Sequence, residues 1–113
     1  MKTKTAIVIL NWNGVAMLQR FLPLVLEHSA EAEVIVADNA STDQSVAMMR
    51  EHFPQVRLVL LDSNYGFAEG YNLALKQVEA DYYLLLNSDV EVGEGWLKPI
   101  VDFLDTHPDY CAC

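Results

Sequence analysis

Four short runs of apolar residues alternate along the chain with four segments that carry an apolar stripe at helical spacing. The runs are rich in Val, Ile and Leu, which is typical of strands buried on both faces of a parallel sheet. These runs are Thr5–Asn11, Glu33–Asp38, Val56–Leu61 and Tyr82–Asn87. The alternation predicts a β-α-β-α-β-α-β-α order and so restricts the fold to the α/β class.

The segments between the runs are predicted to be amphipathic helices, each with its apolar stripe toward the sheet. They are expected at Val15–Glu27, from Ser41 to just before Pro54, at Gly66–Val78, and around the stripe Leu97, Ile100, Val101 and Leu104. Ser41 and Gln44 have the S-x-x-Q spacing of a capping box, which predicts the start of the second helix.

The expected architecture is a Rossmann-like parallel sheet with helices on both faces and right-handed crossovers. The 113 residues allow one domain. The last four residues, Tyr110–Cys113, have the pattern of a fifth strand that has only begun. We therefore expect residues 1–113 to be part of a single domain that is truncated, and we expect its uncovered strand edges to favour self-association.

The charge balance limits the classes of ligand. Seven basic and sixteen acidic residues give a formal net charge of −9, which argues against binding to nucleic acid or to anionic lipid. An acidic chain that holds a phosphorylated ligand usually needs a divalent cation between carboxylate and phosphate. The two cysteines, Cys111 and Cys113, are too close in sequence for an easy intrachain disulfide, and they are expected to be ordinary apolar residues.

Polar residues follow each predicted strand. The four segments are Asn11–Gly14, Asp38–Asp43, Asp62–Gly66 and Asn87–Asp89. In an open α/β sheet, ligands bind beyond the carboxyl ends of the strands, so the four segments are expected to form one site. Each segment taken alone could also be a turn or a helix cap, since Asn, Asp, Ser and Gly favour both.

Two residues at this edge suggest how a base would be recognised. The Asp38 carboxylate, at the end of a buried strand, can accept hydrogen bonds from a base imide N–H or from ribose hydroxyls, or it can cap its own loop. The Trp12 ring can stack on a base or pack against the sheet.

Two further motifs suggest a site for phosphates. Asn64, Gly66 and Gly70 lead into a helix whose first N–H groups suit a phosphate or a ribose, although the glycines could serve only close helix–sheet packing. Asp89 follows a buried strand in a short turn, where a carboxylate can hold Mg²⁺ or Mn²⁺, or can simply face solvent.

Four strings carry a resemblance to a known family: AIVILNWNG, VIVADNASTD, NYGFAEGYNLAL and YYLLLNSDVEV. Together they resemble the N-terminal, nucleotide-binding part of the family 2 glycosyltransferases of GT-A fold, and in particular a bacterial subgroup that often includes rhamnosyltransferases. The resemblance covers nearly the whole chain, with the motifs in order and at family-like spacing.

The resemblance implies roles for individual residues. The segment Leu10, Asn11, Trp12 and Asn13 is similar to the loop that lies against the nucleotide, and Asp38 is similar to the aspartate that binds the uracil or thymine ring. Asn64, Gly66 and Asn72 match the glycine-rich motif beside the nucleotide. Asn87, Ser88 and Asp89 occupy the place of the D-x-D motif, so Asp89 is the implied ligand of Mn²⁺ or Mg²⁺ and Asn87 departs from the pattern.

The resemblance also implies a reaction, namely inverting, metal-assisted transfer of a sugar from a UDP- or dTDP-sugar to a glycan or lipid-linked acceptor. The catalytic base would lie beyond Cys113, so we expect no transfer by these 113 residues alone. A cytoplasmic location is expected, with the full-length protein able to lie peripherally at the inner face of the membrane.

A non-catalytic nucleotide-binding or assembly module is the alternative function. A dinucleotide oxidoreductase is disfavoured, because the first strand is followed by Asn11-Trp12-Asn13-Gly14 and not by G-x-G-x-x-G.

Overall fold

The computed structural model describes residues 3–30, 32–87 and 92–106. The strands and helices occur in the order predicted from the sequence. They are β1 (Thr3–Asn11), α1 (Val15–His28), β2 (Glu33–Asp38), α2 (Ser45–His52), β3 (Arg57–Leu60), α3 (Gly66–Leu75), β4 (Ala80–Asn87) and α4 (Lys98–Thr106).

The four strands form one sheet in the order β3-β2-β1-β4, and all three pairings are parallel. The predicted fold class is confirmed. In the register, Asn11 lies opposite Asp38 on one side of β1, and Leu10 lies opposite Asn87 on the other. The strands therefore end together, and the polar segments that follow them start from one edge of the sheet.

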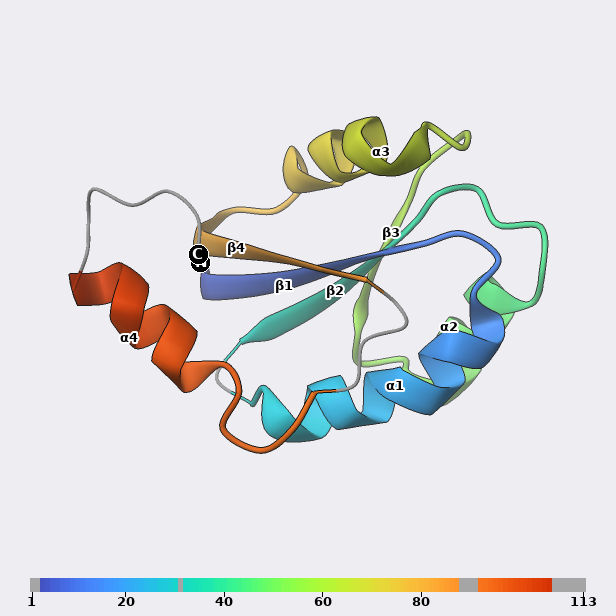
Figure 1. Cartoon of the computed structure of the whole chain (residues 1–113). Helices are drawn as coiled ribbons and strands as arrows, with labels where there is room; N and C mark the ends of the chain where they lie inside the picture. Colours follow the sequence, from blue (N-terminus) through green and yellow to red (C-terminus); the bar gives the residue numbers. More distant parts are fainter. Residues whose placement is uncertain (1–2, 31, 88–91, 107–113) are drawn as a thin grey trace.

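Helices cover both faces of the sheet. In Figure 1, α3 lies on one face while α1, α2 and α4 lie on the other. Strand β1 serves both layers, because Ile7 and Ile9 point into the α1 side and Ala6 and Val8 into the α3 side, all 2% exposed or less. Burial of an isoleucine side chain stabilises a fold by about 1.5–3 kcal/mol, so β1 is the centre of the core.

The outer strand β4 is less covered. Tyr83 and Leu85, opposite Ala6 and Val8, are 42% and 48% exposed. Within the described ranges, α3 covers the β1 side of this face and leaves these two side chains accessible. In the same ranges, no helix is long and apolar enough to cross a membrane.

Two local predictions are wrong. The Ser41–Gln44 capping box does not form, since α2 begins at Ser45 and Gln44 precedes it without a side-chain capping bond. The Ser41 hydroxyl is used instead in contacts between loops. Helix α3 ends at Leu75, earlier than predicted, although Val78 is still buried. The metal-ligand candidate Asp89, its neighbour Ser88 and the strand predicted at 110–113 lie outside the described residues.

Candidate functional site

Asp38 is anchored within the protein at the end of β2. Its side chain is 3% exposed. Oδ1 accepts hydrogen bonds from Asn11 Nδ2 at 3.0 Å and from Ser41 Oγ at 2.7 Å, and Oδ2 accepts from the Ser41 amide at 2.9 Å. A carboxylate offers about four acceptor positions, so these three bonds leave room for one further donor.

The Asn11 side chain links the carboxyl ends of β1 and β2 by a hydrogen bond to Asp38. The side chain is fully buried, and its Nδ2 donates to Asp38 and, at 3.3 Å, to Ser41 Oγ. Because the Asp38 carboxylate can only accept, the amide group must present its nitrogen to it. The Oδ1 atom is then a buried acceptor to which no described residue donates.

Asn13 joins the first loop to the second. Its backbone has a positive φ of 52°, which asparagine tolerates better than most residues. Asn13 Oδ1 accepts from the amides of Thr42 at 2.7 Å and Asp43 at 3.1 Å, while the Asn13 amide donates to Ser41 Oγ at 2.9 Å. In this structure the Asn13 side chain hydrogen-bonds the loop after β1 to the loop after β2.

Asp43 links the starts of two helices and was not singled out from the sequence. Its Oδ2 accepts from the Val15 amide at 3.2 Å, and its Oδ1 accepts from the Ser45 amide at 2.9 Å. Burial alone would raise the pKa of Asp43, but hydrogen bonds from Ser45 and Val15 outweigh it and hold the pKa below its ordinary value. An aspartate two residues before a helix is a recognisable capping signal, whereas its second partner, at Val15, is not visible in sequence.

Asn39 links the second loop to the third and was also missed. It is 2% exposed. Its Nδ2 donates to Asn64 Oδ1 at 3.0 Å and to the Gly66 carbonyl at 3.1 Å, and its Oδ1 accepts from the Tyr65 amide at 3.0 Å. Gly66, with φ 79°, supplies the left-handed turn that starts α3, so a glycine is required there.

Gly70 lets α3 approach this network closely. A Cβ placed on Gly70 would lie 3.1 Å from both Asn39 Nδ2 and Leu10 Cδ2. For Gly70, these distances agree with the alternative reading of the motif, in which the glycine allows close helix–sheet packing.

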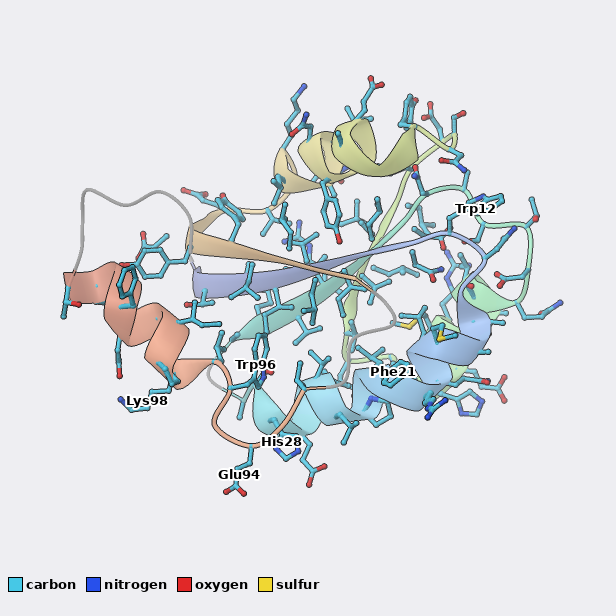
Figure 2. The ribbon with its side chains drawn as sticks, in the orientation of Figure 1. Trp12, Phe21, His28, Glu94, Trp96 and Lys98 are labelled. Carbon is cyan, nitrogen blue, oxygen red and sulfur yellow. The ribbon has the colours of Figure 1, made fainter. Side chains whose placement is uncertain are left out.

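Five of the predicted nucleotide-contacting residues are exposed, namely Asn13 and Gly66, described above, and Trp12, Asn64 and Asn72. Trp12 is 53% exposed and extends away from the sheet in Figure 2. Asn64 and Asn72 are also exposed. The carboxyl edge thus combines the buried side chains of Asn11, Asp38 and Asn39 with an exposed aromatic ring and exposed amide side chains.

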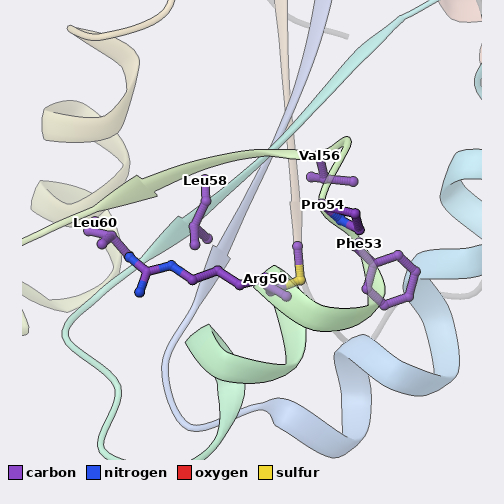
Figure 3. Close-up of a pocket in the computed structure, with 7 residues that line it drawn as sticks. Arg50, Phe53, Pro54, Val56, Leu58 and Leu60 are labelled. Atoms are coloured by element: carbon purple, nitrogen blue, oxygen red, sulfur yellow. The ribbon is translucent and has the colours of Figure 1, made fainter.

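The structure also has a groove of about 320 Å³ between α2 and the outer strand β3. In Figure 3, Arg50 extends along this groove past Leu58 toward Leu60, and Phe53 lies at its other end. None of the residues predicted to contact a nucleotide lines it. Among the described residues, no group of three or more His, Cys, Asp or Glu is gathered to hold a metal ion.

A parallel sheet in the order β3-β2-β1-β4, with polar side chains gathered at its carboxyl edge, is an α/β fold of the class that binds ligands beyond the carboxyl ends of its strands. The family described as "Glycosyl transferase family 2" matches residues 6–113, and the chain belongs to this family.

Its curated relatives include two bacterial glycosyltransferases. One is the poly(ribitol-phosphate) beta-N-acetylglucosaminyltransferase TarS of Staphylococcus aureus, 34% identical over 80 residues that cover 68% of this chain and 14% of the relative. Another is the N-acetylglucosaminyl-diphospho-decaprenol L-rhamnosyltransferase of Mycobacterium tuberculosis, 28% identical over 103 residues, which are 80% of this chain and 34% of the relative. The chain therefore spans about a third or less of these proteins.

Similar solved structures include S. aureus TarS 1-349 in complex with UDP-GlcNAc, with a TM-score of 0.77 and 27% identity over 93% of this chain and 32% of that one. The mannosyltransferase PcManGT from Pyrobaculum calidifontis, in complex with GDP-Man and Mn²⁺, shares the fold, with a TM-score of 0.78 and 22% identity. The match covers 92% of this chain and 33% of the mannosyltransferase.

Proposed function

We propose that this chain binds the nucleotide of a UDP- or dTDP-sugar for glycosyl transfer. The observation that carries the proposal is the carboxyl edge, in which the exposed Trp12 follows directly after the buried Asn11–Asp38 pair. A ligand at this edge would meet a ring that can stack on a base and an acceptor that can take an imide N–H. The UDP-GlcNAc complex of the similar TarS structure supports this choice of ligand.

Within that proposal, the residues of the first loop have different roles. Leu10 and Trp12 are the residues of the first loop that would contact the nucleotide, whereas Asn11 and Asn13 hold the loop in place through their hydrogen bonds. The remaining acceptor position of Asp38 would receive the imide N–H of uracil or thymine. Asn64, Gly66 and Asn72 would border the ribose and phosphates.

A divalent cation, Mn²⁺ or Mg²⁺, belongs to the same proposal. A diphosphate and a chain of net charge −9 repel each other, and a hard cation that takes oxygen ligands from both removes the conflict. Asp89, with Asn87 and Ser88 as neutral neighbours in sequence, is the proposed protein ligand. The reaction would be an inverting transfer to a glycan or lipid-linked acceptor in the cytoplasm or at the inner membrane face.

Calorimetry with UDP and dTDP, with and without Mn²⁺, tests the proposal. We expect metal-dependent binding that Asp89→Asn removes, because this substitution keeps the size of the side chain and deletes its charge. Glu51→Gln is the matched control: it deletes one negative charge from an exposed site on α2 and should leave binding unchanged.

Two outcomes would contradict parts of the proposal. Undiminished, metal-independent binding of UDP by the Asp89→Asn variant would show that Asp89 is only a turn residue. Equal affinity of the wild type for ADP and UDP would contradict recognition of the imide group by Asp38.

A further inference from the structure

The Tyr71 hydroxyl lies between two strands of the sheet. Tyr71 is on α3 and is 2% exposed, packed in the same cluster as Ala6 and Val8 of β1. Its hydroxyl accepts a hydrogen bond from the Leu10 amide at 3.3 Å and donates one to the Leu86 carbonyl at 2.8 Å. One side chain from the covering helix thus connects β1 and β4.

The position of this bridge follows from the strand geometry. The Asn11 carbonyl accepts from the Asn39 amide, so it faces the β2 side. Backbone groups of successive strand residues point to opposite neighbours, so the Leu10 amide faces β4. Leu10 lies opposite Asn87, which places the Leu86 carbonyl as its partner in a parallel ladder. The hydroxyl therefore takes part in the last rung between β1 and β4 that the described residues include.

The hydroxyl is suited to hold this rung at neutral pH. Burial raises the pKa of Tyr71 above its ordinary value, and the hydrogen bond with the Leu10 backbone opposes that rise only in part. The phenol therefore remains protonated and can donate to Leu86 while it accepts from Leu10.

The two bridged residues lead directly into the proposed site. Leu10 is followed by Asn11 and Trp12, and Leu86 is followed by Asn87, the end of β4 and the start of the motif to which the metal is assigned. Tyr71 itself is next to Asn72. The hydroxyl thus bonds to backbone groups within two residues of Trp12 and of Asn87, and the Tyr71 backbone adjoins Asn72 of the glycine-rich motif.

We propose that Tyr71 is a positioning residue whose hydroxyl fixes the spacing between the carboxyl ends of β1 and β4, and with it the span that the nucleotide must bridge. This inference rests on the proposed function, since the span matters only if a nucleotide binds there. Tyr71→Phe keeps the buried ring and removes the bridge.

Tyr83 provides a closely matched control. Its hydroxyl also joins two backbone groups, accepting from the Ala80 amide at 3.2 Å and donating to the Val78 carbonyl at 2.7 Å, but it does so at the amino end of β4. Tyr71→Phe and Tyr83→Phe thus remove bonds of the same kind from opposite ends of one strand. Tyr83 is more exposed, so the unfolding free energy of each variant is measured as well.

We expect Tyr71→Phe to weaken Mn²⁺-dependent UDP binding about tenfold, or about 1.4 kcal/mol, and Tyr83→Phe to change it less than twofold. Amide hydrogen exchange, followed by NMR in the chain without nucleotide, gives a second readout. Exchange at Leu10 should accelerate in Tyr71→Phe relative to exchange at Ile7 in the middle of β1, while Tyr83→Phe leaves this ratio unchanged.

The outcomes separate the two proposals. Wild-type UDP affinity in Tyr71→Phe, or losses in both variants that follow their losses of stability, would overturn the positioning role and leave the proposed function standing. Absence of any UDP or dTDP binding by the wild type would refute the proposed function and with it the link to a nucleotide span. In that case an unchanged Leu10 exchange rate would also refute the bridge itself.

Discussion

Asn39→Ala tests whether the contacts between the loops stabilise the fold. The substitution removes a side chain that is 2% exposed and that makes three hydrogen bonds to the third loop. Two are donated to Asn64 and Gly66, and one is accepted from Tyr65. Alanine keeps the Cβ and cannot replace any of them.

The expected loss can be worked from those bonds. A typical intramolecular hydrogen bond contributes about 0.5–1.5 kcal/mol net, so three contribute about 3 kcal/mol. At about 2.1 cal/mol/K of unfolding entropy per residue, 113 residues convert each kcal/mol into roughly 4 °C. We therefore expect Asn39→Ala to lower the Tm by roughly 12 °C.

Thermal unfolding followed by circular dichroism measures the change in Tm, and urea unfolding measures the free energy, with Asn72→Ala as the control. Asn72 is exposed on α3, and no hydrogen bond of its side chain is found among the described residues. Replacing it with Ala should stabilise the helix by up to about 0.5 kcal/mol. A loss below about 1 kcal/mol for Asn39→Ala would refute the reasoning, since it would mean that water replaces the bonds between the loops.

Three further predictions address other features. Gly70→Ala should destabilise the fold by about 1–2 kcal/mol in urea unfolding, because the new Cβ would lie 3.1 Å from Leu10 Cδ2. This loss is expected despite the better helix propensity of alanine, and a gain in stability would show that Leu10 moves aside freely. The folded-state pKa of Asp43 lies below its ordinary value of 3.8, so its contribution to the free energy of unfolding is present above that value and is lost as pH falls through the folded pKa. Asp43→Asn should therefore make the free energy of unfolding depend less on pH in the acid range. An unaltered pH profile would exclude Asp43 as the source of that dependence. The exposed pair Tyr83 and Leu85 should support self-association of the 113-residue chain, which sedimentation velocity detects and Leu85→Lys should weaken; a monomer at all concentrations would contradict this.

The strands and the common polar edge were predictable because they depend on local patterns. Runs such as Glu33–Asp38 are short, apolar and bounded by turn residues, and β2 has the same bounds in the structure. The Gly66 start of α3 was also predicted, because the turn before a helix needs a residue that tolerates positive φ.

The partners of individual polar side chains were not predictable from the sequence. The Ser41–Gln44 spacing indicated a cap, yet the Ser41 hydroxyl bonds to Asp38 and receives the Asn13 amide, 28 positions away in the chain. Asn39 likewise finds its partners 25–27 positions away. Such a side chain can cap its own helix or bond to another loop, and which of the two bonds forms depends on how the sheet aligns the loops. The nucleotide and metal roles of individual residues stay predictions.

The bonds that cross between loops also determine how the carboxyl edge loses its structure. Asn13, Asp43 and Asn39 each connect two of the loops that follow β1, β2 and β3, so none of these three loops can open without breaking bonds of its neighbour. The entropic cost of ordering these loops is then part of the folding free energy, so it does not reduce the affinity for a ligand that binds at this edge. Heating should therefore cause no separate loss of ligand affinity through opening of these loops before the whole domain melts.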